Sequence, residues 1–246
     1  MSVAPTNSCR NCGAQIEGAF CSQCGQKHLS NGLNIPEIAS ELLDTVVKPD
    51  SRLWTTFLGL TRNPGHVASE YADGKRARYV NPVRYCIAGI AASAAATIAT
   101  GEFEQIGLSM LPEGGGSSSE SIKLFTSVFA KYLNILAILS VPIYTVCLRL
   151  FFLRSGRNMA EIFSFSCFVV GHVSLLGVVA TFVNSYVYFM GLWPSMIVNF
   201  GITIYAAHVF FRRKFGYTFL AMNMSYMIYL VVLSGLFWVL YSYHAS

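Results

Sequence analysis

The longest uncharged stretch of this 246-residue sequence restricts its fold more than any other feature. No Asp, Glu, Lys or Arg occurs in the 50 residues between Glu161 and Arg212, or in the 32 residues after Lys214. A helix needs only about 20 apolar residues to cross a bilayer. Charged residues make up 12% of the chain, against about 25% in soluble domains. The sequence therefore predicts an all-α multi-pass membrane protein, and it excludes a disordered, collagen-like or disulfide-rich secreted chain.

Five apolar stretches are candidates for membrane spans. They lie at about 83–100, 131–152, 162–184, 194–211 and 217–241. The two short basic loops between them, 149–157 and 212–214, fall on the same side as the N-terminus, as the positive-inside rule requires. The sequence thus predicts five spans, with the N-terminus in the cytoplasm and the C-terminus outside.

The first of these stretches is the least hydrophobic, so a soluble Ala-rich helix is its alternative interpretation. Seven of the residues from 85 to 100 are alanine. Gly89, Ser93 and Thr97 recur at a spacing of four, which lets another helix approach the backbone closely. We expect this helix to span the membrane and to lie toward the centre of the bundle.

The seven cysteines fall into two groups. Cys9, Cys12, Cys21 and Cys24 form two Cys-x2-Cys units, each followed by glycine, whereas the other three are scattered through apolar segments. The spacing is typical of a closed structural site in which four thiolates hold Zn²⁺. Iron is the rival metal, and two disulfides are the alternative that a reducing cytosol disfavours. Since only eight residues separate the two units, folding of this ribbon must depend on the metal.

Short helices connect the ribbon to the first span. An amphipathic helix is expected at 34–48, a second helix at 52–60 and a third at 65–71. Asn63-Pro64 and Asn81-Pro82 each combine a capping side chain with proline at the first helical position. Because aromatic and basic residues are interleaved here, the segment predicts a collar (residues 34–84) at the depth of the lipid headgroups.

Four basic residues of the collar are candidates for binding a lipid phosphate. They are Lys75, Arg76, Arg78 and Arg84. Juxtamembrane cations attract anionic lipid by about 1 kcal/mol each. A specific phosphate pocket and a general positive-inside anchor are the two interpretations of this cluster.

Several motifs occur together between residues 9 and 85. They are two Cys-x2-Cys-Gly units ending in Cys24-Gly25-Gln26, then Trp54-Thr55-Thr56-Phe57, Arg62-x-Pro64-Gly65 and Glu70-Tyr71-x2-Gly74-Lys75-Arg76-x-Arg78-Tyr79-x-Asn81-Pro82. This set resembles a family of bacterial membrane proteins defined as a domain of unknown function. The resemblance implies an N-terminal ribbon and a multi-pass bundle in the bacterial inner membrane, and it brings no activity and no catalytic residue.

Two histidines are the ionisable groups of interest within the spans. His172 lies ten residues into the third span, about 15 Å deep at 1.5 Å per residue, and His208 lies near the inner end of the fourth. His172 is either a neutral packing residue or a group that handles protons or substrate. The separation of the two in depth argues against a shared metal.

The sequence lacks the common catalytic patterns. It contains no HExxH, Gly-x-Ser-x-Gly or P-loop motif, and a membrane enzyme would depend on Glu102, Glu104 or His172. We therefore expect a non-enzymatic protein in which the ribbon (1–30) docks a cytoplasmic protein, the interfacial helices (31–82) contact anionic lipid, and residues 83–246 form the anchor. No nucleic acid is expected as a partner, and the oligomeric state is open. A channel, transporter or lipid-handling protein is the alternative.

Overall fold

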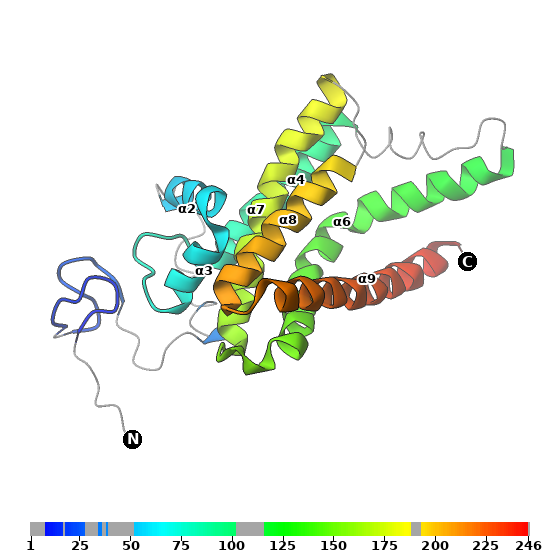
Figure 1. Cartoon of the computed structure of the whole chain (residues 1–246). Helices are drawn as coiled ribbons and strands as arrows, with labels where there is room; N and C mark the ends of the chain where they lie inside the picture. Colours follow the sequence, from blue (N-terminus) through cyan, green and yellow to red (C-terminus); the bar gives the residue numbers. More distant parts are fainter. Residues whose placement is uncertain are drawn as a thin grey trace.

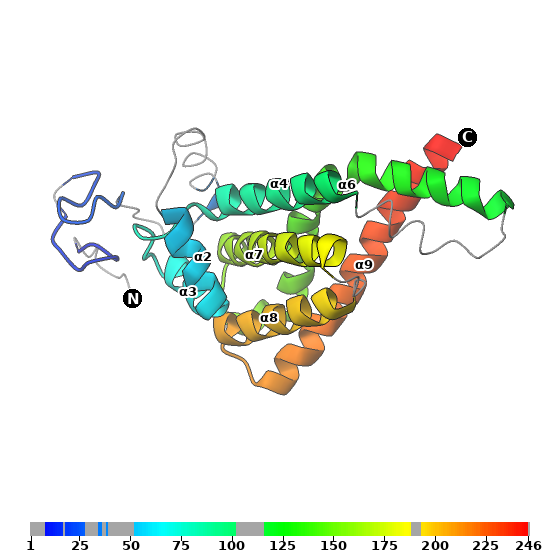
Figure 2. The same ribbon diagram turned by 90° about the horizontal axis from the view of Figure 1, so that it is seen from above.

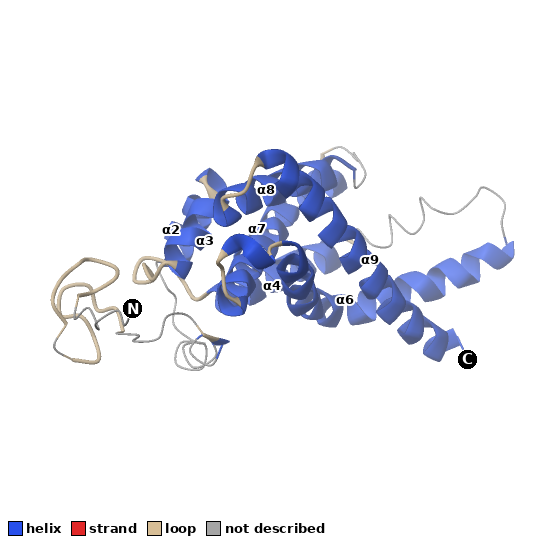
Figure 3. Cartoon of the chain, turned by 60° about the horizontal axis from the view of Figure 1, so that its bottom comes forward, coloured by secondary structure: helices blue, strands red, loops and turns tan. Residues whose placement is uncertain are grey.

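The computed structural model describes residues 8–16, 18–27, 34, 35, 38, 52–101, 116–187 and 193–245 (Figure 1). Its α-helices are α2 (Arg52–Arg62), α3 (Pro64–Ala72), α4 (Pro82–Thr100), α6 (Gly116–Phe151), α7 (Met159–Tyr186), α8 (Trp193–Phe211) and α9 (Phe215–Ala245). The ribbon is drawn as loop in Figure 3, with two isolated β-bridges. The predicted all-α class is confirmed for the described chain. Almost all of the helix predicted at 34–48 lies outside the described residues.

Four of the helices are long and apolar enough to cross a membrane, namely α4, α7, α8 and α9. They contain the first, third, fourth and fifth predicted spans. The second predicted span lies in the C-terminal part of α6, whose described apolar segment, Ile135–Phe151, is shorter than the other four. Helix α6 itself begins at Gly116, well before residue 131, because hydropathy marks where a helix becomes apolar and not where it begins.

Helix α7 is the central helix, and Figure 2 shows it between α4 and α8. It crosses α4 where two glycines meet: a Cβ atom on Gly89 would lie 2.3 Å from the Gly171 carbonyl oxygen. The predicted close packing at Gly89 is therefore confirmed. The expected central position of α4 is wrong, since 33% of its apolar window is buried against 50% for α7. Small residues allow one tight contact, but they do not require a helix to be enclosed.

Helices α6 and α9 form a second group. The N-terminal part of α6 and the C-terminal part of α9 both extend away from α7 and α8 (Figure 1). They pack closely on each other, and Ser225 of α9 donates a hydrogen bond to the carbonyl of Cys147 in α6. Only 6% of the apolar window of α9 is buried. The exposed surface of this pair is thus largely apolar, as expected for helices that face lipid.

The described part of the collar packs against the sides of α7 and α8. Asn63 and Asn81 cap α3 and α4, each followed by proline, so both predicted helix starts are confirmed. Gly65 of α3 faces α8 so closely that a Cβ atom would lie 2.4 Å from the Ala206 carbonyl oxygen. The Tyr71 ring meets Phe168 of α7 edge-on, with centroids 5.3 Å apart. The collar therefore packs against the sides of the first turns of α7 and does not simply precede that helix at its end.

The basic loops gather at the collar end of the bundle. Arg157, in the loop before α7, lies 2.6 Å from Asp73 of the collar, and Arg212, after α8, lies 3.8 Å from the same carboxylate. Residues predicted to share one side of the membrane thus lie together in space. The division of the chain at residues 30 and 82 stays a prediction.

Candidate metal centre and its attachment to the collar

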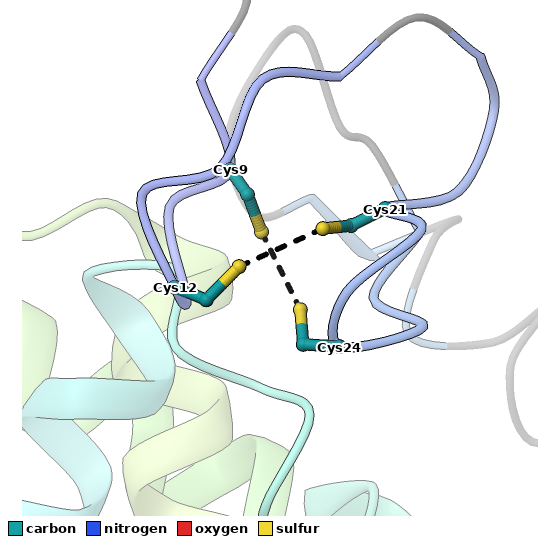
Figure 4. A group of neighbouring side chains, drawn as sticks. All are labelled: Cys9, Cys12, Cys21 and Cys24. Carbon is teal, nitrogen blue, oxygen red and sulfur yellow. Dashed lines mark hydrogen bonds between the residues drawn. The ribbon is translucent and has the colours of Figure 1, made fainter.

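The four N-terminal cysteines converge on one point (Figure 4). Their Sγ atoms all lie within 4.8 Å of one another. Each pair of cysteines is held by a tight turn, in which the amide of the following glycine donates to the carbonyl of the first cysteine. Gly13 and Gly25 adopt φ values of +79° and +69°, which side chains other than glycine rarely accept. The glycine after each Cys-x2-Cys unit is therefore what allows the chain to turn back.

The sulfur distances fit a tetrahedral metal site. Cys9 and Cys24 are 3.6 Å apart at Sγ, and so are Cys12 and Cys21, whereas a disulfide requires about 2.05 Å. Four thiolates about 2.3 Å from a central Zn²⁺ ion lie about 3.8 Å from one another. Each of these two contacts joins a cysteine of the first Cys-x2-Cys unit to one of the second, so a single ion would bind all four thiolates and cross-link the two units. The described residues contain no other group of three or more such ligands.

Local backbone donors favour the charged form of one ligand. The backbone amides of Cys24 and Gln23 donate to the sulfur of Cys21 and lower its pKa to about 7. A thiolate is the form that binds metal. Apart from the cysteines, Ile16 is the main buried side chain of the ribbon, with Ala14 packed beside it. So small a core cannot hold the ribbon folded without further support.

Gln26 attaches the ribbon to the collar. Gln26 donates from Nε2 to the Gly74 carbonyl at 2.7 Å, and its Oε1 accepts from the amides of Arg76 at 3.0 Å and Ala77 at 3.2 Å. Arg10 of the first turn also lies on this loop, since a Cβ atom on Gly74 would be 2.8 Å from its Cδ. We call these contacts the Gln26 clamp. They fix the metal site to the loop that precedes α4.

Sequence reasoning missed this clamp. Gln26 is polar and stands directly after the last cysteine turn, but its partners lie about 50 positions further along the chain. The only signal in the sequence was the joint occurrence of Cys24-Gly25-Gln26 and the Gly74-Lys75-Arg76 element.

The four predicted lipid-binding cations turn to different surroundings. Lys75 pairs with Glu70 at 3.1 Å. Arg76 is only 7% exposed, lies over the Tyr71 ring and donates from Nε to the Tyr71 carbonyl. Arg78 is exposed beside the Tyr79 ring, and Arg84 is partly buried in the first turn of α4. Their role in lipid binding stays a prediction, but Arg76 serves mainly to pack the collar.

Glu70 is the polar centre of the collar. Its carboxylate accepts from the Tyr79 hydroxyl at 2.5 Å and from Lys75. Partial burial raises the pKa of Glu70, but the hydrogen bonds from Tyr79 and Lys75 outweigh it, so the pKa lies below its ordinary value. Burial, reinforced by this carboxylate, raises the pKa of Tyr79 to about 12. The pair therefore joins α3 to the end of the loop that receives Gln26.

The two histidines lie in separate places. His172 is 1% exposed; its Nδ1 lies 3.0 Å from the Tyr85 hydroxyl, and its ring packs on Phe57 of α2. His208 is partly buried beside the Phe215 ring. Tyr85 is in the first turn of α4, so His172 lies level with the start of that helix. Counting along α7 alone missed this, because the collar covers the first turns of α7.

A mainly apolar pocket of about 490 Å³ lies among α6, α7, α8 and α9. Hydroxyl and amide side chains line it from all four helices, namely Ser140, Tyr144, Ser174, Asn199, Thr203, Asn223, Tyr226 and Tyr229. Sequence reasoning did not find it, because no single helix shows a polar stripe that marks it.

The family comparison covers most of the collar and the first half of α4. Residues 50–93 match the family described as "Protein of unknown function (DUF3667)". This segment runs from the start of α2 into α4 and includes the loop that receives Gln26. No curated protein and no solved structure matches the chain.

Proposed function

We propose that this integral membrane protein is a non-enzymatic docking platform, in which a Zn²⁺-bound ribbon is held on the collar and presents its outer surface to a cytoplasmic protein. The Gln26 clamp carries this proposal. A ribbon that only needed to be folded would not require three hydrogen bonds to the collar loop. A binding surface with a fixed orientation loses less entropy on binding a partner.

Zn²⁺ is the ion that we propose for the four cysteines. The ion would supply structural cross-linking only, since four thiolates leave no open position for a substrate or water. Iron is the other metal that four thiolates accept. Elemental analysis of the protein purified from its native membrane distinguishes the two. One zinc per chain supports the proposal, and one iron per chain replaces zinc as the cofactor.

Phe20 is the side chain that we propose as the anchor for the partner. It lies between the two cysteine turns and is 62% exposed, although a large aromatic side chain gains most when it is buried. Aromatic residues of this kind often contribute most of the binding energy at an interface. Lys27 stands directly opposite Phe20 in an isolated β-bridge and is exposed, so the partner surface combines an aromatic and a basic side chain.

A photo-crosslinking residue in place of Phe20 tests the docking proposal. The full chain carrying it is expressed in its native membrane, irradiated, and compared with a chain carrying the same residue at the exposed Ser22. A single cytoplasmic adduct that forms from position 20, and that is lost in Cys9→Ser with Cys12→Ser, supports the proposal. Absence of any adduct, or an adduct that survives loss of the metal ligands, contradicts it.

The membrane orientation and lipid contact belong to the same proposal. Arg157, Arg212 and the collar lie at one end of the bundle, which supports a cytoplasmic ribbon in the bacterial inner membrane, a periplasmic C-terminus and attraction of the collar to anionic lipid. Reporter fusions after residue 27 and after residue 245 test the orientation. Both reporters on one side of the membrane would contradict it. The mass of the protein in detergent tests self-association, because a dimer has twice the 27.0 kDa mass of one chain.

The pocket among α6, α7, α8 and α9 favours one other function, a transporter or lipid-handling protein. A volume of about 490 Å³ among apolar helices is within the usual range of small-molecule sites. Thr203→Trp would fill this space from α8. The test is whether Thr203→Trp corrects a growth defect of the deletion strain that the wild type corrects. If it does not, while the crosslink from position 20 is unchanged, the result favours transport over docking.

A further inference from the structure

A second basic surface lies at the collar end of the bundle, away from the ribbon. It is a cleft of about 550 Å³ between the end of α6 and the start of α9. We call it the basic cleft; it is lined chiefly by Leu150, Leu153, Arg154, Arg213, Lys214 and Tyr217. Arg213 donates to the Arg154 carbonyl, and the Tyr217 hydroxyl donates to the Phe151 carbonyl. These two contacts hold the walls of the cleft in place.

The three cations of the basic cleft lack acidic partners. Three other basic residues near this end of the bundle are paired with acids: Arg157 with Asp73 and Glu161, Arg212 with Asp73, and Lys75 with Glu70. Arg149 instead donates to the Arg157 carbonyl. In the described chain, no carboxylate forms an ion pair with Arg154, Arg213 or Lys214. Like charges that share a cleft repel one another, so a bound anion would relieve an unfavourable arrangement here.

The apolar wall of the basic cleft indicates what kind of anion fits. Leu150 and Leu153 are 56% and 59% exposed, and the Tyr217 ring is exposed beside them. A free phosphate ion gains nothing from exposed leucines. A phospholipid gains from both parts of the cleft, because its phosphate meets the cations while its acyl chains cover the leucines. Tyrosine is also the usual side chain at headgroup depth.

The position of the cleft agrees with a lipid ligand. It lies where the apolar segment Ile135–Phe151 of α6 ends and where α9, the least buried of the candidate spans, begins. Both helices leave apolar surface exposed on the way to the cleft. A lipid in the adjoining leaflet therefore reaches the cations without leaving the bilayer.

We propose that the basic cleft binds the headgroup of an anionic phospholipid from the leaflet next to the collar. Arg154, Arg213 and Lys214 contact the phosphate, and Leu150 and Leu153 contact the acyl chains near the glycerol. This site is distinct from the four collar cations considered above and does not depend on docking at the ribbon. A lipid bound here would supply the negative charge that no carboxylate of the described residues supplies to these three cations.

Native mass spectrometry of the full chain in mixed detergent and lipid micelles tests the proposal. Phosphatidylglycerol and phosphatidylcholine are supplied in equal amounts, and bound copies are counted for the wild type and for Arg154→Gln with Arg213→Gln and Lys214→Gln. The control is Lys27→Gln with Arg52→Gln and Arg62→Gln, three exposed cations outside both the basic cleft and the four collar candidates. We expect the number of phosphatidylglycerol molecules retained per chain to fall at least tenfold in the cleft variant and less than twofold in the control, both relative to the wild type. Equal losses in the two variants would overturn the proposal, because attraction would then be general.

Two further arms separate a lipid from a free phosphate and a specific loss from misfolding. Leu153→Gln keeps all three cations, and we expect it to lower retention of phosphatidylglycerol severalfold. Inorganic phosphate at millimolar concentration should not displace the lipid. Full displacement by phosphate, or unchanged retention in Leu153→Gln, would show a site for a soluble anion and would overturn the proposal. The helical circular dichroism of each variant must match that of the wild type. Because Arg154→Lys keeps the charge, this variant should retain most of the phosphatidylglycerol that the triple Gln variant loses.

Discussion

In the ribbon and collar, several polar side chains are paired across segments, although Ser69 Oγ and Arg76 Nη1 are buried without a hydrogen-bond partner in the described part of the chain. Helices α6 and α9 instead leave most of their apolar surface exposed. Gln26 and Glu70 each join two segments of the first region, and Asp73 joins the collar to the loops before α7 and after α8. In the second region only 6% of the apolar window of α9 is buried, and within the described residues no carboxylate pairs with Arg154, Arg213 or Lys214. The first region is therefore fixed by contacts within the protein, whereas the second leaves most of its apolar surface outside such contacts.

Loss of the metal ligands should have the largest effect on the ribbon. Cys9→Ser with Cys12→Ser removes two of the four thiolates, and structural zinc sites supply about 10–16 kcal/mol of folding free energy. We expect the metal content to fall to near zero and trypsin to cleave rapidly after Arg10 and Lys27, while helical circular dichroism stays nearly constant. Ser22→Ala is the control. If the double variant keeps its metal or its protease resistance, the ribbon does not fold around a four-cysteine site.

Glycine substitutions compare the tightest and the most open helix surfaces. Gly89→Ala places a Cβ atom 2.3 Å from the Gly171 carbonyl oxygen, so α4 and α7 must separate, at a cost of about 1–3 kcal/mol. Gly235→Ala on α9 meets nothing within 4 Å and should leave stability unchanged or slightly higher. Thermal unfolding of both variants in the same detergent measures the difference. Equal melting temperatures would mean that α4 and α7 do not cross at these glycines.

Removing the Gln26 clamp should separate the ribbon from the collar. Gln26→Ala leaves the amides of Arg76 and Ala77 without their acceptor, and unsatisfied buried groups cost about 1–3 kcal/mol; partial exposure to water puts the expected cost at the low end. Metal content should stay at the wild-type level, while the crosslink from position 20 should weaken severalfold. Gln23→Ala, on the exposed side of the second turn, should change neither. A crosslink of full strength in Gln26→Ala would show that the clamp does not orient the ribbon.

The smallest expected effect is the pH dependence of the Glu70–Tyr79 pair. The pKa of Glu70 is lower in the folded protein than in the unfolded chain. Its contribution to the free energy of unfolding is therefore complete above the unfolded pKa of about 4.3 and is lost as the pH falls through the lower folded pKa. Because the pKa of Tyr79 is raised to about 12, its contribution is complete below about pH 10 and is lost as the pH rises toward 12.

Tyr79→Phe tests this pair. Removal of the hydroxyl should cost about 1 kcal/mol at neutral pH and should make stability less dependent on pH at both ends of the range. Melting temperatures at pH 3, 7 and 11 provide the measurement. An unchanged pH profile in Tyr79→Phe would show that the hydrogen bond between Tyr79 and Glu70 contributes nothing.

Local patterns in the sequence predicted local structure well. Asn63-Pro64 and Asn81-Pro82 marked two helix starts that the structure confirms, because capping depends only on residues within one turn. The two Cys-x2-Cys-Gly units predicted that four sulfurs would meet, because tight turns fix each pair and the chain between them is short. The apolar runs located α4, α7, α8 and α9 for the same reason, since each helix is recognised from its own residues.

Contacts between distant segments could not be predicted in this way. Helix α7 is apolar on all sides, so its sequence did not show which faces meet α4, the collar and α8. The depth of His172 depended on where the collar ends, and the burial of Arg76 depended on Tyr71. The Gln26 clamp joins segments about 50 positions apart, and a single glutamine carries no pattern that identifies such a partner.

Hydrogen exchange at the amides of Arg76 and Ala77 tests most directly whether the metal site and the collar form one unit. Mass spectrometry of peptides from this loop, measured on the full chain in detergent, would report both amides. We predict slow exchange in the wild type and exchange at least tenfold faster both in Gln26→Ala and after removal of the metal by a chelator. Fast exchange in the wild type, or slow exchange that survives both treatments, would show that the ribbon is only tethered to the membrane domain.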